Sequence, residues 1–234
     1  MRWLMPYDLY ERHFVVSRLL KDALGMSQEA SRILDVGGRA ELLEQFVPDR
    51  VVSINIDGSG DLLGSGLALP FADNALSAVV SIDTLEHLPQ EVRVPFLREC
   101  LRVARQCVVV AAPFGSEGHK GYERELAALY QSLFGEPHIY LSEHVRHGLP
   151  TLADIDDFAV SLQQAKRVKR FFAGDYLWQG RQFERGIRAS RKSAWRRHFL
   201  NLYNQVTSLA LFHPVRLQSS PDPKTNRFYL LIEK

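Results

Sequence analysis

The sequence has little cysteine and no long apolar run. Its two cysteines, Cys100 and Cys107, are too few for a disulfide scaffold, and no metal-binding Cys/His spacing surrounds them. No stretch of about 18 apolar residues occurs, and the first residues reach proline and charge before any apolar segment. These absences argue against a secreted or membrane-spanning protein, so we expect a cytoplasmic one.

Net charge is also nearly absent, since 29 Lys and Arg face 27 Asp and Glu. The balance hides a basic segment, because residues 166–197 hold eleven Lys and Arg against only Asp175 and Glu184. Concentrated positive charge suggests an anionic neighbour, such as a phosphorylated substrate, a membrane surface or nucleic acid. No recognised nucleic-acid-binding module accompanies the charge, which makes nucleic acid the weakest of the three.

The sequence does contain the pattern of an α/β domain. Its 234 residues, 46% of them hydrophobic, fit one domain over 1–234 that carries insertions. Several short runs are apolar without alternation, which is typical of parallel strands covered by helices on both faces. The predicted strands are 33–36, 51–56, 78–82, 107–112, 168–172 and 227–233, and the predicted helices are 7–24, 39–46, 92–104, 123–134 and 152–165.

Polar and glycine residues follow the first predicted strands, where open parallel sheets bind their ligands. Gly37 and Gly38 allow a ligand to approach the backbone, and the helix predicted after them would offer unpaired N–H groups. Asp57 lies 22 residues beyond Asp35, a separation that suits an acid binding the hydroxyls of a ribose. The alternatives are a plain tight turn and a solvated strand end. A nicotinamide-dependent oxidoreductase would share these features, but Arg39 breaks its Gly-x-Gly-x-x-Gly pattern.

Four strings in succession carry a family resemblance: ILDVGG, NID, LALPFADNALSAVVSIDTLEHLP and VVVAAPFG. Over residues 33–115 the chain resembles the class I S-adenosylmethionine-dependent methyltransferases. The resemblance implies a Rossmann-like α/β fold with a seven-stranded, mostly parallel sheet, an antiparallel last strand and helices on both faces. It also implies S-adenosylmethionine as cofactor, bound at its methionine end by Asp35, Gly37 and Gly38, at the ribose by Asp57, and on the floor by Asp83 and Thr84.

The chain departs from the family pattern in two places. Arg39 and Glu41 occupy positions where the family's turn has glycine. Ser65 stands where similar sequences often carry an acid, so that the resemblance leaves the adenine to be bound by Gly66, Leu67 and Ala68. A non-catalytic, methyltransferase-like binding module therefore remains an alternative to an enzyme.

Histidines and a glutamate gather in the predicted insertion 115–151, where the family builds its acceptor pocket. They are His138, Glu143, His144 and His147, and His87 precedes a predicted helix. A positioned His or carboxylate can deprotonate a hydroxyl, so we assign His144, Glu143 and His87 as catalytic. A metal site or a hydrogen-bonded lid are the alternatives for this cluster, and we assign no metal ligand because no strong metal-binding spacing is present. We expect a small-molecule or glycan acceptor, methylated on a hydroxyl of a sugar or lipid-linked glycan.

The second predicted insertion, a basic helical cap over 175–215, mixes arginine with aromatic and aliphatic residues. A helix with one apolar and one basic face can lie on an anionic membrane, where each basic residue contributes about 1 kcal/mol. The alternative is an ordinary helical cover with a solvated basic face. The cap therefore leaves open a location at the periphery of the membrane.

Overall fold

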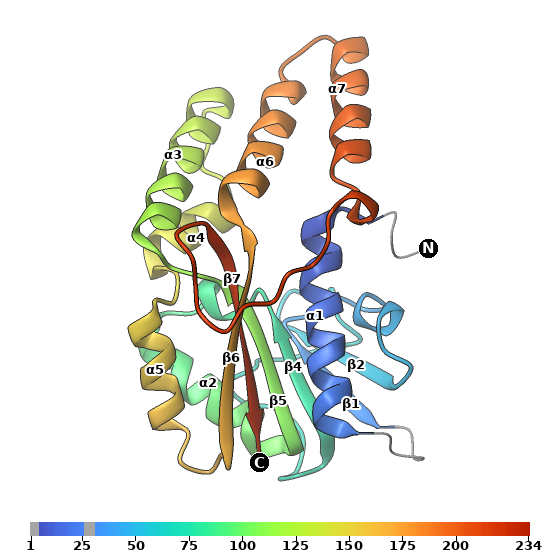
Figure 1. Ribbon diagram of the computed structural model, residues 1–234, viewed down its shortest axis with the longest axis vertical. Coiled ribbons are helices and arrows are strands. Elements are labelled where there is room, and N and C mark those ends of the chain that lie inside the picture. The colour runs from blue at the N-terminus through green and yellow to red at the C-terminus, as the bar shows by residue number, and fades with distance from the viewer. Residues whose placement is uncertain (1–4, 26–30) are drawn as a thin grey trace.

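The computed structural model describes residues 5–25 and 31–234, and its centre is a seven-stranded sheet (Figure 1). The strand order is β3-β2-β1-β4-β5-β7-β6, in which β7 runs antiparallel to both of its neighbours. The predicted Rossmann-like methyltransferase sheet is thereby confirmed. The strands are β1 (Arg32–Val36), β2 (Arg50–Asn55), β3 (Leu62–Leu63), β4 (Leu76–Ile82), β5 (Ala104–Pro113), β6 (Arg167–Asp175) and β7 (Thr225–Glu233).

Helices cover both faces of the sheet, as the non-alternating strands predict. On one face α1 (Tyr7–Leu24) packs Val16 and Leu20 against Ile33 of β1. On the other face α2 (Gln90–Val103) and α5 (Leu152–Ser161) enclose a core that contains Leu34 of β1. Successive residues of β1 therefore enter different cores, which explains why the strand has no polar face.

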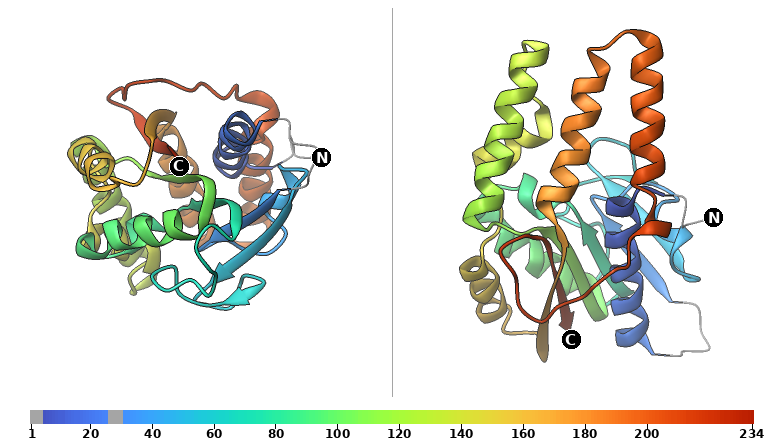
Figure 2. Two further views of the ribbon diagram at one scale, coloured as in Figure 1. Left: turned by 90° about the horizontal axis from the view of Figure 1, so that it is seen from below. Right: turned by 45° about the horizontal axis from the view of Figure 1, so that its top comes forward.

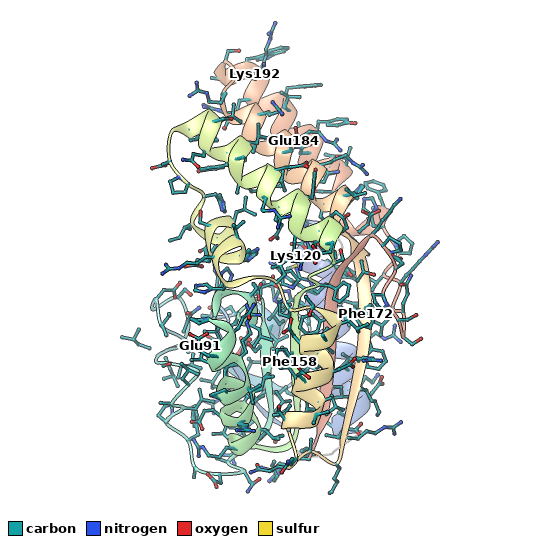
Figure 3. All side chains as sticks on the ribbon, turned by 90° about the vertical axis from the view of Figure 1, so that its left-hand side faces the viewer. Glu91, Lys120, Phe158, Phe172, Glu184 and Lys192 are labelled. Atoms are coloured by element: carbon teal, nitrogen blue, oxygen red, sulfur yellow. The ribbon has the colours of Figure 1, made fainter. Side chains whose placement is uncertain are left out.

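Four further helices stand beyond the carboxyl ends of the parallel strands (Figures 1 and 2). Residues 115–151 contain α3 (Glu117–Phe134) and α4 (Ile139–His147), and residues 175–215 contain α6 (Tyr176–Ser190) and α7 (Ala194–Thr207). Figure 3 shows Lys192, between α6 and α7, at the tip farthest from the sheet. None of the helices in the described ranges combines the length and apolarity that crossing a bilayer requires.

The helix predicted at 39–46 is wrong, because the segment forms only a 3₁₀ turn, η2 (Leu43–Gln45). Glu41 has a φ of 65°, which a right-handed helix does not allow. The amide of Asn55 binds the carbonyls of Gly37 and Gly38 at 3.0 and 3.3 Å, in place of helical N–H groups. Gly37 and Gly38 are consequently followed by an irregular loop and not by the expected helix N-terminus.

Candidate active site

A cleft of about 1270 Å³ lies between the carboxyl ends of β1, β2 and β4 and the helices beyond them. The three candidate catalytic residues His87, Glu143 and His144 line it. Ala68 is exposed and is not among the lining residues. The residues assigned to the cofactor that do line the cleft are Asp35, Gly37, Gly38, Asp57, Gly66, Leu67, Asp83 and Thr84.

The glycine loop after β1 is shaped so that only glycine fits. Gly37 has a φ of 80°, and a Cβ atom there would collide with the side chain of Thr84. A Cβ atom on Gly38 would collide with the carboxylate of Asp35. Asp35 itself is 2% exposed, its Oδ1 atom has no hydrogen-bonding partner, and burial raises its pKa to about 7. The loop thus presents bare backbone and an unsatisfied carboxylate to the cleft, a combination that fits the polar end of a nucleoside-bearing ligand.

The loops after β2 and β3 contribute an exposed acid and a closely packed glycine to the cleft. Asp57 is exposed, and its Oδ1 accepts a hydrogen bond of 2.8 Å from the backbone N–H of Ser59. Hydrogen bonding from the side chain of Ser59, and then from its backbone, holds the pKa of Asp57 below its usual range, so the group is a carboxylate at neutral pH. A Cβ atom on Gly66 would collide with Phe96 and Val36. An exposed acid and a close-packed glycine that line the same cleft suit a ribose and a flat base.

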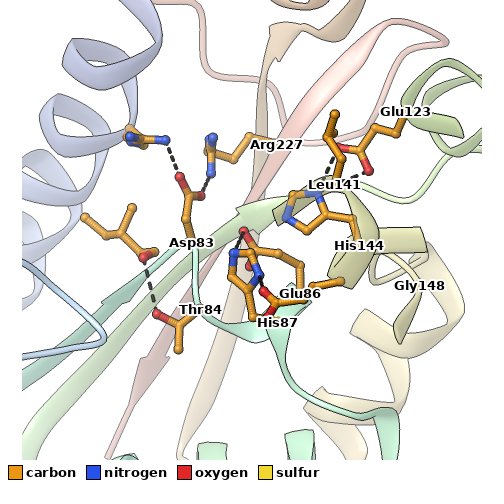
Figure 4. Close-up of polar contacts among 12 residues, drawn as sticks. Asp83, Thr84, Glu86, His87, Glu123, Leu141, His144, Gly148 and Arg227 are labelled. Carbon is orange, nitrogen blue, oxygen red and sulfur yellow. Dashed lines mark hydrogen bonds and ion pairs between the residues drawn. The ribbon is translucent and has the colours of Figure 1, made fainter. Parts of the chain in front are cut away.

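Asp83, assigned to the cofactor floor, is held by two arginines that the sequence did not connect with it. Arg12 of α1 and Arg227 of β7 both donate to its carboxylate (Figure 4). The backbone of Asp83 has a φ of 51°, and Thr84 donates to the carbonyl of Val36 at 3.3 Å. Asp83 therefore joins the first helix and the last strand to the floor of the cleft.

Two histidine–carboxylate pairs form the wall toward α3 and α4 (Figure 4). His87 ends the 3₁₀ helix η3 (Leu85–His87), and its Nδ1 lies 2.7 Å from a carboxylate oxygen of Glu143. His144 of α4 places its Nδ1 3.0 Å from Glu123 of α3. The two imidazole rings are 4.8 Å apart between centroids. Residues from three separate elements are thereby brought into one cluster.

The two histidines differ in their electrostatics. Burial and then the neighbouring charge of His144 lower the pKa of His87. Burial would also lower the pKa of His144, but the hydrogen bond and charge of Glu123 outweigh it and raise the pKa overall. His144 is therefore the more basic of the two rings.

Two glutamates complete this wall, and neither was assigned from the sequence. Glu86 is 1% exposed, its Oε2 has no hydrogen-bonding partner, and burial raises its pKa to about 7. Glu123 is 21 residues from its partner His144, so no local spacing links them. For Glu86 the only signal in the sequence is its place immediately before His87.

The other two histidines of the sequence cluster have different places. His138 lines the cleft but serves as the N-cap of α4, where its Nδ1 accepts from the backbone N–H of Leu141 at 3.4 Å. His147 ends the same helix, where its carbonyl accepts from Arg93 at 3.1 Å, and it is not among the residues that line the cleft. Of the four residues that the sequence analysis grouped by their close spacing, only Glu143 and His144 belong to the histidine–carboxylate pairs.

Comparisons with known proteins find similarity to methyltransferases. A sequence family described as a methyltransferase domain matches residues 42–111, which include Asp57, Gly66 and the stretch from Asp83 to His87. The match ends before α3 and α4 begin. No curated protein matches the sequence significantly.

Solved structures show the same fold at low sequence identity. A SAM-dependent methyltransferase from Thermotoga maritima matches with a TM-score of 0.53 and 12% identity, over 97% of this chain and 96% of its own. A SAM-dependent methyltransferase from Archaeoglobus fulgidus gives a TM-score of 0.52 and 16% identity, over 97% and 99%. A phosphoethanolamine N-methyltransferase from Haemonchus contortus, in complex with phosphomonomethylethanolamine and S-adenosylhomocysteine, gives 0.53 and 12%, over 97% and 56%.

Proposed function

We propose that the chain is a class I S-adenosylmethionine-dependent methyltransferase that methylates a hydroxyl of a small polar acceptor, such as a sugar or a lipid-linked glycan. The observation that carries this proposal is the pairing of His87 with Glu143 and of His144 with Glu123 on the wall of the cleft. The family match and the fold favour this function over a nicotinamide-dependent oxidoreductase and over a non-catalytic module.

The donor is assigned to the strand-end loops, because their shape and charge suit it. Asp35, Gly37 and Gly38 would hold the methionine end, and Asp57, Gly66 and Leu67 the nucleoside. When bound, S-adenosylmethionine supplies a sulfonium-activated methyl group, and the acceptor oxygen bonds to its carbon as the carbon–sulfur bond breaks and leaves its electron pair on sulfur. Because the methyl is already activated, alignment is the main task of the protein and can supply roughly 7–11 kcal/mol.

A hydroxyl is favoured as the acceptor because the cluster can take its proton. A neutral amine attacks a methyl group without prior deprotonation, whereas a hydroxyl needs a base, which contributes about 10²–10⁴ in rate. The Nε2 atom of His144 is buried without a hydrogen-bonding partner, while Glu123 binds the Nδ1 atom of the same ring. Glu123 therefore orients the ring, and Nε2 stays available for the hydroxyl proton.

The walls around the cluster fit an acceptor with both flat and polar surfaces. Tyr140, Tyr176 and Trp178 line the cleft together with the amides of Gln179 and Asn226. Aromatic faces beside hydrogen-bonding groups are suited to a sugar ring, which has apolar faces and hydroxyl edges. This combination supports a sugar or glycan acceptor.

The test combines ligand binding with product analysis. Calorimetric titration should give tight binding of S-adenosylhomocysteine and none of NADH. The protein should then be incubated with S-adenosylmethionine and panels of hydroxyl and amine acceptors, and the products weighed by mass spectrometry. A gain of one methyl on a hydroxyl supports the proposal, whereas methylation of amines alone contradicts it.

We also propose that α7 rests on an anionic membrane surface when the acceptor is lipid-linked. The α7 stripe, defined as Trp195, Phe199, Leu202 and Val206, follows helical spacing, yet each member is at least 47% exposed. An ordinary cover helix would bury such a stripe. The charge at the same end of the molecule is complementary to anionic lipid, since Arg191, Lys192, Arg196 and Arg197 lie between and along α6 and α7.

Vesicle flotation tests this surface. The wild-type chain should float with vesicles that contain phosphatidylglycerol and stay below with pure phosphatidylcholine. The double substitution Trp195→Ala with Phe199→Ala should abolish flotation, whereas Val160→Ala, an exposed apolar residue on α5, should leave it unchanged. Absence of flotation, or a stripe variant that floats like the wild type, would rule the membrane surface out.

A further inference from the structure

Three potential metal-ligand atoms converge on the wall of the cleft, one each from Glu86, His87 and His144. A carboxylate oxygen and two ring nitrogens lie within 4.8 Å of one another. Two of the residues have a buried ligand atom without a hydrogen-bonding partner, Oε2 of Glu86 and Nε2 of His144. An unpartnered buried polar atom costs about 1–3 kcal/mol, so two in one place call for something that binds both.

The Nδ1 atoms of the two histidines contact carboxylates, as the second ring nitrogen of a metal-binding histidine often does. His87 points its Nδ1 at Glu143 at 2.7 Å, and His144 points its Nδ1 at Glu123 at 3.0 Å. A carboxylate that accepts from Nδ1–H fixes the tautomer and leaves the lone pair on Nε2. The Nε2 of His87 is 4.0 Å from the carboxylate of Glu86. His87 thus directs its Nε2 toward the buried acid, and the unpartnered Nε2 of His144 belongs to the same cluster of residues.

The charges around this point favour a cation. Glu86, Glu123 and Glu143 surround the two rings, and the ion pairs of these three acids within residues 5–25 and 31–234 are all with histidines. Glu86 is the deepest of them, at 1% exposed. Burying a carboxylate without a charged partner is costly, and a divalent cation would supply that partner.

We propose that Glu86, His87 and His144 together bind one divalent transition-metal ion, with its remaining coordination positions open to the cleft. Two imidazoles and one carboxylate are a ligand set suited to Zn²⁺, Mn²⁺, Fe²⁺ or Co²⁺. Ligand bonds of about 2.0–2.2 Å require the three atoms to draw together around the ion.

The role of the ion rests on the proposed function, although its binding does not. An acceptor hydroxyl that occupies an open position would have its pKa lowered by the positive charge, and its proton would leave to water. The resulting oxygen is the nucleophile that the methyl transfer needs. In the metal-bound chain the cluster would activate the hydroxyl through the ion, whereas direct proton transfer to Nε2 of His144 would apply to the metal-free chain.

Binding is tested on the full chain after treatment with a chelator and removal of the chelator. Titration with Zn²⁺ should show one tight site by calorimetry, and Co²⁺ should give visible absorption of a nitrogen- and oxygen-ligated ion. Zn²⁺ should also raise the melting temperature. His144→Ala and Glu86→Gln should each weaken Zn²⁺ at least tenfold, while His147→Ala, the same change on the same helix, should leave Zn²⁺ affinity unchanged.

Affinity for S-adenosylhomocysteine, measured on each variant, shows whether it is folded, and the melting-temperature shift of the wild-type chain needs no variant. If the chain binds no stoichiometric metal, or if the variants bind it as the wild type does, the metal site is overturned while the proposed function stands. If metal binds as expected but no hydroxyl acceptor is methylated, the proposed function fails and the site remains.

Discussion

The proposed donor and acceptor ends of the cleft are built in different ways. The donor end, which we define as the loops after β1, β2 and β4, consists of glycine positions, backbone and isolated acids such as Asp35 and Asp57. The acceptor end, defined as His87, Glu123, Glu143 and His144 with Glu86, consists of paired side chains from η3, α3 and α4. The family match covers part of the donor end but stops before α3. The proposed donor end therefore lies partly within the family match, whereas α3 and α4 lie outside it.

The largest expected effect falls at the acceptor end. His144→Ala should lower turnover by about 10²–10⁴, because the change removes the group that activates the hydroxyl. Affinity for S-adenosylhomocysteine should stay within twofold, since the donor end is untouched. Steady-state kinetics with the acceptor found by mass spectrometry, together with calorimetry, measure both values. A parallel loss of donor affinity would mean that the two ends do not act separately.

A second effect concerns the stability of the donor end. Burial raises the pKa of Asp35 to about 7, so in the absence of donor the folded chain favours its protonated form. The free energy of unfolding should therefore fall as pH rises from the unfolded value of about 3.9 to the folded value and level off above it.

Asp35→Asn removes this penalty. The difference in free energy of unfolding between the variant and the wild type should grow by about 2 kcal/mol in favour of the variant from pH 5 to pH 8, as measured by urea denaturation. The same variant should bind S-adenosylhomocysteine more weakly, because the carboxylate is lost. A difference from the wild type that does not change with pH would show that Asp35 ionises normally in the folded chain.

A smaller effect is expected at the nucleoside. Asp57→Ala should weaken S-adenosylhomocysteine at least tenfold, because the ribose would lose a charge-assisted hydrogen-bonding partner. Asp61→Ala is not a suitable control, since Asp61 binds Ser53 at the base of the same loop. Asp73→Ala, an exposed acid paired with Arg102 outside the cleft, serves instead and should leave affinity unchanged. Equal affinities for the wild type and Asp57→Ala would remove Asp57 from the site.

The position of the strand-end residues at the cleft could be predicted from the sequence because its signals are local. The strand at 33–36 is apolar on both faces because Ile33 and Leu34 enter two different cores. The residues that follow this strand necessarily lie at the carboxyl ends of the parallel strands. The helix at 39–46 could not be excluded in the same way. That helix does not form because Asn55, on the next strand, binds the carbonyls of Gly37 and Gly38.

The acceptor end shows the limit of local signals. His87 and Glu143 are 56 residues apart, and only the packing of α4 against η3 brings them together. The close spacing of His138 and His147 to His144 suggested a larger cluster, but one became a helix cap and the other lies outside the cleft. Contacts between elements, and not spacing along the chain, decide which histidines share a site.

A crystal structure with S-adenosylhomocysteine tests the account most directly. We predict that the ribose hydroxyls lie within hydrogen-bonding distance of the Asp57 carboxylate, the amino-acid end lies over Gly37 and Gly38, and the sulfur faces His87 and His144. A donor bound elsewhere, or a cleft closed by the guanidinium of Arg39, would contradict the division into donor and acceptor ends.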